Sequence, residues 1–101
     1  MLKKRYSKDR KSCTVTFTVR AEQAAGAAKA VLLGDFNNWD KTAGLMKKTP
    51  EGGFEASLKL ETRREYHFRY LFDDNRWDND WNADKYCPNP YGGEDNGVII
   101  V

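Results

Sequence analysis

Ser12 to Arg20 reads S-C-T-V-T-F-T-V-R, which is the clearest strand signal in the chain. Cys13, Val15, Phe17 and Val19 alternate with threonines, and a period of two residues is typical of a strand with one buried face. The β-branched residues also favour an extended backbone. The sequence therefore predicts a half-buried antiparallel strand here.

Similar short runs recur along the chain, with turn residues between them. The further candidate strands are Lys29 to Leu33, Leu45 to Lys48, Phe54 to Leu60, Glu65 to Phe72, Arg76-Trp77 and Val98 to Val101. Ala21 to Ala30 contains helix-forming residues but is interrupted by Gly26, so we expect an irregular connection with one helical turn. Many short strands without a long helix predict an all-β antiparallel β-sandwich of the immunoglobulin-like (early set) type.

The charge of the chain is distributed unevenly. At 101 residues the chain has the size of one domain. Its first eleven residues hold six cations and one acid, whereas the rest holds eleven cations and fourteen acids. We expect residues 1–11 to form a basic, flexible arm and residues 12–101 to form the folded module. A solvated terminus is the favoured reading of the arm, and contact with an anionic partner is the alternative.

The location of the protein is predicted from what the sequence lacks. It contains no run of about 20 apolar residues, so no membrane-spanning segment is expected. The N-terminus lacks the apolar core of a secretory signal, and we expect a cytoplasmic protein. Reduced thiols at Cys13 and Cys87 are favoured, and a bridge between them is the alternative.

Few residues are suited to catalysis or metal binding. His67 is the only histidine, and no nucleophile–histidine or phosphate-binding glycine motif is present. The run from Asp78 resembles the start of a calcium loop, but Ala83 and Asn89 replace the required glycine and glutamate. A solvated acidic loop is expected instead. We therefore predict a protein without catalytic residues, cofactor or metal site.

The run from Gly34 to Asp40 places a tryptophan, Trp39, in a turn beside amides and carboxylates. Sugar rings stack on aromatic faces while their hydroxyls require polar partners, so this combination suits a sugar-binding site. Trp77 and Trp81 follow between polar neighbours and are further candidate platforms. From these neighbours alone, exposure and burial are equally expected for a tryptophan.

The order of these elements resembles carbohydrate-binding module family 48. The matching runs are G-D-F-N-N-W from Gly34, E-Y-H-F-R-Y from Glu65, W-x-x-D from Trp77 and Y-G-G-E-D-N-G-V-I-I-V from Tyr91. The family includes N-terminal domains of isoamylase and glycogen branching enzymes and the glycogen-binding domain of AMP-activated protein kinase. The chain is most similar to small stand-alone bacterial members, which are associated by similarity with glycoside hydrolase family 13. The resemblance implies the immunoglobulin-like sandwich again.

The resemblance also implies a binding site. Trp39 and Trp77 match the two tryptophans that stack on glucan, and Asn96 matches the asparagine that bonds to sugar hydroxyls. His67 occupies the position of a lysine, which implies a weaker site because a mostly neutral ring replaces a long cation. Trp81 is the fifth candidate.

The resulting hypothesis is a non-catalytic module that binds α-1,4-linked glucan, either glycogen-like or starch-like polysaccharide or maltooligosaccharide. The alternative is a protein-interaction or regulatory module whose aromatic patch docks on a glycogen-metabolism enzyme. Nucleic acid is disfavoured as a partner because the basic arm has no aromatic residue besides Tyr6.

Overall fold

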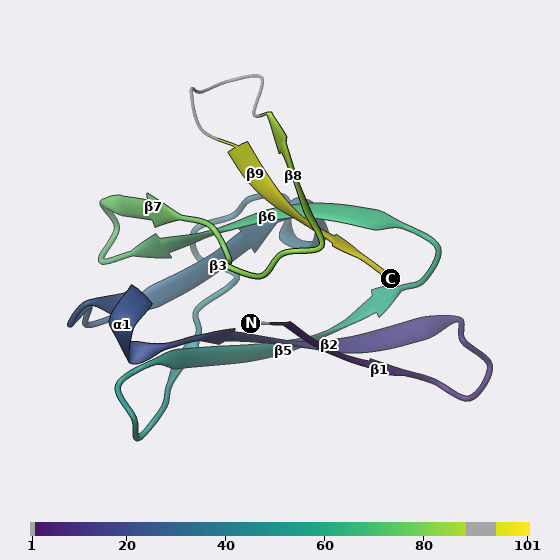
Figure 1. The fold of residues 1–101 in the computed structure, drawn as a ribbon, viewed down its shortest axis with the longest axis horizontal. Coiled ribbons are helices and arrows are strands. Elements are labelled where there is room, and N and C mark those ends of the chain that lie inside the picture. The colour runs from purple at the N-terminus through teal and green to yellow at the C-terminus, as the bar shows by residue number, and fades with distance from the viewer. Residues whose placement is uncertain (1, 89–94) are drawn as a thin grey trace.

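Two antiparallel sheets face each other across an apolar core in the computed structural model, which describes residues 2–88 and 95–101 (Figure 1). One sheet has the strand order β1-β2-β5-β4, and the other has the order β3-β6-β9-β8 with β7 also paired to β6. The strands are β1 Leu2–Tyr6, β2 Ser12–Val19, β3 Ala30–Gly34, β4 Lys47–Lys48, β5 Phe54–Glu61, β6 Glu65–Phe72, β7 Arg76–Asp78, β8 Lys85–Pro88 and β9 Asp95–Ile100. The helical elements are α1 Ala21–Ala24 and the short 3-10 turn η1 Asp35–Asn37. The predicted immunoglobulin-like β-sandwich is confirmed.

The alternation in β2 builds the core. Phe17 and its apolar neighbours on β2 are buried, and Phe17 meets Phe68 of β6 edge to face with ring centroids 5.2 Å apart. Tyr70 and Phe72 continue the buried row along β6. Buried aromatic pairs of this kind join the two sheets, so β6 presents one face to the core and the other outward.

The N-terminal residues differ from the prediction of a flexible arm. Residues 2–6 form β1, which pairs along β2 from Leu2 opposite Phe17 to Tyr6 opposite Cys13. Lys4 points to the other sheet, where its Nζ lies 2.7 Å from Asp84 Oδ2. Because this strand is mostly cationic, its alternation gave no apolar signal in the sequence.

The acidic stretch from Asp78 also differs from the solvated loop that was predicted. Asp80 is fully buried, and its Oδ2 accepts a hydrogen bond of 2.7 Å from the Tyr70 hydroxyl. Strand β8 follows and pairs with β9. A buried carboxylate requires hydrogen-bond donors, and the hydroxyl of Tyr70 on β6 provides one of them here.

Two further expectations concern the cysteines and the membrane. Cys13 is buried in the core and Cys87 is half-buried on β8, and both are free thiols. Within residues 2–88 and 95–101, no helix has the length and apolar character required to cross a bilayer.

Candidate functional site

The outward face of the β3-β6-β9-β8 sheet brings together four of the five candidate residues. Successive side chains of a strand point to opposite faces, so His67, Arg69 and Leu71 of β6 point outward while their neighbours enter the core. We call the surface formed by Trp39, His67, Arg69, Trp77 and Asn96 the tryptophan face.

Trp39 reaches this face from the turn after β3. Its half-buried ring packs on the apolar cluster of Val31, Leu33 and Leu71. Asn38 and Trp39 both have φ of 56°, in the left-handed region. Such a conformation is strained for a bulky residue, and strain of this kind is concentrated at functional sites.

Asp35 connects this turn to β6. Its Oδ1 accepts a hydrogen bond from Trp39 Nε1 at 3.1 Å, and its Oδ2 accepts one from the backbone N–H of His67 at 2.9 Å. Gly34, just before it, permits a close approach, because a Cβ there would lie 2.5 Å from the His67 carbonyl oxygen. One carboxylate therefore positions the Trp39 ring relative to β6.

Trp77 reaches the same face from β7. In the strand register it lies opposite Leu71, which also supports Trp39, and it is 38% exposed. The guanidinium of Arg69 lies 5.4 Å from its ring centroid, and Lys41 Nζ lies 5.9 Å from it. Cations near an aromatic face are attracted to it and restrict the ring.

His67 and Asn96 lie farther along the face. Val98 of β9 pairs with His67, so Asn96, two residues earlier, points to the same side. Asn96 Nδ2 lies 3.4 Å from His67 Nδ1, and Asn96 is only 6% exposed. His67 is half-buried, which leaves it the more accessible of the two polar groups.

Trp81 lies elsewhere. It is 56% exposed and lines a separate hollow with Thr18, Arg20 and Gln23, at the ends of β2 and α1. Its neighbour Asp80 is fully buried and accepts a hydrogen bond from Tyr70 of the core. The structure therefore does not bring Trp81 to the tryptophan face.

Sequence reasoning missed three residues that shape this face. Arg69 was visible as the outward neighbour of His67 in the alternation of β6, but it was not singled out. Asp35 and Lys41 belong to turns, where no periodicity indicates which way a side chain points. Their contacts with Trp39 and Trp77 depend on the folded turn.

The loop that follows Trp39 is held by Asp40. Its Oδ1 accepts hydrogen bonds from the Thr42 backbone N–H at 2.8 Å and from the Thr42 hydroxyl at 2.7 Å. These bonds hold the pKa of the Asp40 carboxyl below its ordinary value of 3.8. The loop that carries Lys41 is thus organised at neutral pH. Across residues 2–88 and 95–101, no cluster of three metal-ligating side chains occurs.

The sequence profile of carbohydrate-binding module 48 (isoamylase N-terminal domain) matches residues 6–92. That profile describes a binding module rather than a catalytic domain, and its match spans most of the chain. The run Y-G-G-E-D-N-G-V-I-I-V begins with Tyr91 to Glu94, and these four residues lie outside the described residues. A search of curated proteins finds no match.

Proposed function

Because this chain belongs to the carbohydrate-binding module 48 family, we propose that it binds α-1,4-linked glucan on its tryptophan face without catalysing a reaction. The ligand is glycogen-like or starch-like polysaccharide, or a maltooligosaccharide. In this proposal Trp39 and Trp77 stack on sugar rings, and His67 and Asn96 bond to hydroxyls.

The observation that carries the proposal is the meeting of two tryptophans at Leu71. Trp39 packs on Leu71 from the turn after β3, and Trp77 lies opposite it on β7. Neither indole is fully buried, so both retain surface for a ligand. Arg69 and Lys41 add hydrogen-bond donors next to Trp77.

The expected affinity is modest. By analogy with bases on aromatic side chains, each stacking contact contributes about 1–3 kcal/mol. Two such contacts and a few hydrogen bonds, less the cost of ordering the sugar, correspond to a Kd between roughly micromolar and millimolar.

The test is titration calorimetry with maltoheptaose, supported by electrophoresis in gels containing glycogen. We expect Trp39→Ala and Trp77→Ala each to weaken binding by roughly 5- to 150-fold, the equivalent of one stacking contact. Trp81→Ala is the matched control, since it removes an exposed indole from another surface.

Three outcomes would contradict the proposal. The wild-type protein would show no retardation by glycogen, the Trp39→Ala and Trp77→Ala variants would bind as the wild type does, or cellohexaose would bind as well as maltoheptaose. The last result would leave carbohydrate binding intact but reject the α-1,4 linkage. A cytoplasmic location, an association with glycoside hydrolase family 13 and docking on a glycogen-metabolism enzyme stay predictions.

A further inference from the structure

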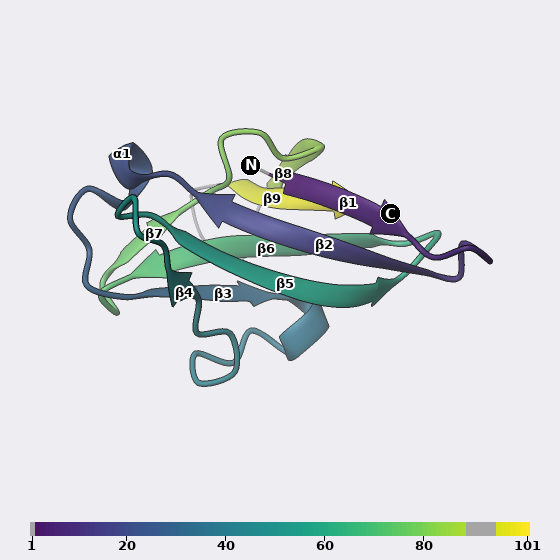
Figure 2. The ribbon, with the colours of Figure 1, turned by 90° about the horizontal axis from the view of Figure 1, so that it is seen from below.

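Trp81 is the most exposed of the three tryptophans, and it lies in a hollow of its own. The hollow measures about 280 Å³, and Thr18, Arg20, Gln23 and Asn82 line it together with the indole. We call it the Trp81 hollow. Figures 1 and 2 both show α1, which carries Gln23, and β7 at the same end of the sandwich. The hollow therefore lies at that end, next to the tryptophan face but not part of it.

The loop that carries Trp81 is held in place by its buried neighbour, Asp80. The two carboxylate oxygens of Asp80 accept hydrogen bonds of 2.7 Å each, one from the Tyr70 hydroxyl and one from the Asn82 backbone N–H. These bonds fix the backbone on both sides of Trp81. An aromatic ring on a fixed backbone loses less freedom when a ligand stacks on it, so less of the binding energy is spent on ordering.

α1 holds the same loop from the other side. Gln23 is 4% exposed, and its Nε2 donates hydrogen bonds to Asp78 Oδ2 at 3.2 Å and to the Asn79 carbonyl. The guanidinium of Arg76 donates to the carbonyls of Gln23 and Ala24 at 3.2 and 2.7 Å. The short helix and the loop are thus joined, and the walls of the hollow are formed before any ligand arrives.

The side chains that line the hollow fit a sugar. Trp81 contributes the one aromatic ring, while the other lining residues offer hydroxyl, amide and guanidinium groups. The side chains of Arg20 and Asn82 are exposed, and neither donates a hydrogen bond to another group within residues 2–88 and 95–101. One flat apolar face beside several polar groups suits a pyranose, whose C–H face stacks while its hydroxyls form hydrogen bonds.

Size and charge narrow the ligand further. Pockets for drug-sized molecules measure about 300–1,000 Å³, so the Trp81 hollow suits one or two sugar rings. Its described lining contains one cation, Arg20, and no acid, which favours a neutral ligand. An apolar ligand would leave the polar groups of the lining without partners.

We propose that the Trp81 hollow is a second sugar site, which binds a glucose ring of the same polysaccharide that the tryptophan face binds. The ring stacks on Trp81, and Arg20 and Asn82 donate hydrogen bonds to its hydroxyls. The inference rests on the proposed function, because the ligand is another part of the same α-glucan.

The second site acts through local concentration. A single stacking contact changes an equilibrium constant by only about 5- to 150-fold, which holds a free sugar weakly. Trp77 and Trp81 are four residues apart, so their Cα atoms lie within about 14 Å of each other. A branch of a glycogen particle that is already held on the tryptophan face is therefore present at high effective concentration at the hollow. A short chain stacked on the tryptophan face does not turn into the hollow.

The first test compares polymer with oligosaccharide. In gels containing glycogen, we expect Trp81→Ala to weaken retention roughly two- to tenfold, whereas its Kd for maltoheptaose in calorimetry stays that of the wild type. Trp81→Phe keeps an aromatic platform and should be retained nearly as well as the wild type. Tyr6→Ala is the matched control, since it removes an exposed aromatic ring from β1, away from both sites.

The second test observes the hollow by itself. The indole N–H signals of the full chain are followed by NMR during titration with maltotriose, and Trp81→Phe assigns one signal by its loss. In the Trp39→Ala/Trp77→Ala variant, about 10–50 mM maltotriose should still shift the Trp81 signal, because a single stacking contact binds weakly. Arg20→Ala, added to this variant, should reduce the shift at a given sugar concentration at least twofold.

The outcomes separate this inference from the proposed function. Equal retention of the wild type and Trp81→Ala by glycogen would overturn the second site and leave the tryptophan face intact, as would a Trp81 signal that maltotriose does not move. A weaker Kd of Trp81→Ala for maltoheptaose would show one continuous site instead of two. Loss of glycogen retention in Trp81→Ala, with Trp39→Ala and Trp77→Ala retained as the wild type is, would reject the proposed function and also the cooperation of two sites.

Discussion

Trp39 has a backbone conformation that disfavours large residues, yet its large side chain makes several contacts. Its backbone lies in the left-handed region, its ring rests on three apolar side chains, and its indole N–H is held by Asp35. A smaller residue such as asparagine or glycine would fit the turn with less strain. The needs of the turn therefore do not explain the large ring, whereas its packing on the three apolar side chains and the proposed stacking on sugar do.

His67 is the residue at which the proposed site departs from its family pattern. We predict that His67→Lys strengthens maltoheptaose binding about three- to tenfold, because a charge-assisted hydrogen bond to a hydroxyl contributes about 1 kcal/mol more than a neutral one. Titration calorimetry measures the change, and His67→Ala supplies the baseline. Equal affinities of His67→Lys and His67→Ala would show that this position does not contact the sugar.

At the scale of elements, the loop between β7 and β8 is held by a buried polar group. Asp80 accepts hydrogen bonds from the Tyr70 hydroxyl at 2.7 Å and from the Asn82 backbone at 2.7 Å. Burial, with the nearby Asp80 carboxylate as a second cause, raises the pKa of Tyr70 well above its ordinary value of 10.0. The neutral hydroxyl is thus the form that the folded protein stabilises.

This contact predicts a dependence of stability on pH. Because the pKa of Tyr70 is raised on folding, its contribution is complete below pH 10 and is lost as the pH rises toward the folded value. We expect Tyr70→Phe to lower the free energy of unfolding by about 1–3 kcal/mol at neutral pH, since buried Asp80 loses a donor. The difference from the wild type should shrink above pH 10. Urea unfolding at both pH values measures it.

Tyr6→Phe is the matched control for that experiment. Tyr6 lies on the edge strand β1 and is 40% exposed, so its loss should change stability little at either pH. A Tyr70→Phe variant whose deficit is the same at neutral and alkaline pH would disprove the assignment to the buried hydroxyl.

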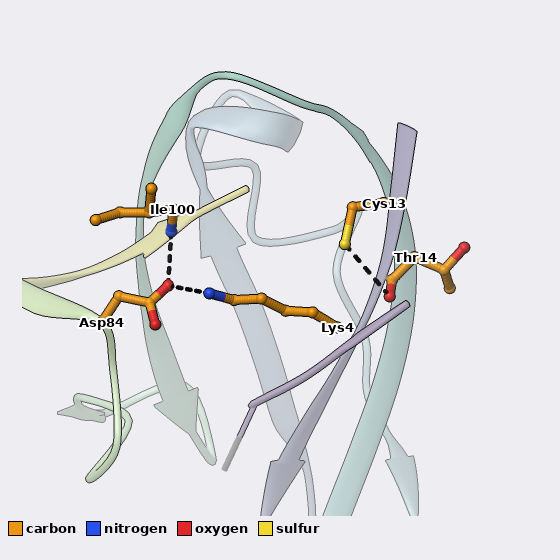
Figure 3. Close-up of polar contacts among 5 residues, drawn as sticks. All are labelled: Lys4, Cys13, Thr14, Asp84 and Ile100. Atoms are coloured by element: carbon orange, nitrogen blue, oxygen red, sulfur yellow. Dashed lines mark hydrogen bonds and ion pairs between the residues drawn. The ribbon is translucent and has the colours of Figure 1, made fainter. Parts of the chain in front are cut away.

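At the scale of the whole molecule, the two sides of the sandwich differ in whether polar contacts connect the two sheets. On the side of β1, Asp84 Oδ2 lies 2.7 Å from Lys4 Nζ and accepts a hydrogen bond of 2.7 Å from the Ile100 backbone N–H (Figure 3). This carboxylate connects β1 of one sheet to β9 of the other. On the β5 side, an apolar groove remains between the sheets.

The two contacts of Asp84, with Lys4 and with Ile100, predict unequal effects of substituting Lys4 and Asp84. Lys4→Ala removes a partly exposed ion pair and should cost about 0.2–1 kcal/mol of unfolding free energy. Asp84→Ala also leaves the Ile100 N–H without its acceptor and should cost about 1–3 kcal/mol. Urea unfolding at neutral pH compares them. Equal losses, or an additive double variant, would contradict the shared role of Asp84.

Local patterns were sufficient for most of the fold. β2, β5 and β6 alternate clearly, so their existence and their buried faces follow from the chain itself. β1 and β8 were missed because their side chains are largely polar, and such strands are defined by the neighbours with which they pair. Pairing between distant segments leaves little trace in a short window of sequence.

The sandwich, the family and the two stacking candidates thus followed from alternation and motif order, which are properties of the chain read in sequence. Which side chains share a surface did not, because that depends on strand register and on buried contacts between distant segments. The strand register places Trp77 opposite Leu71, on which Trp39 packs. Trp81, next to the buried Asp80, lies on another surface. The added cations at Arg69 and Lys41, and the Trp81 hollow, likewise exist only once the sheets have formed.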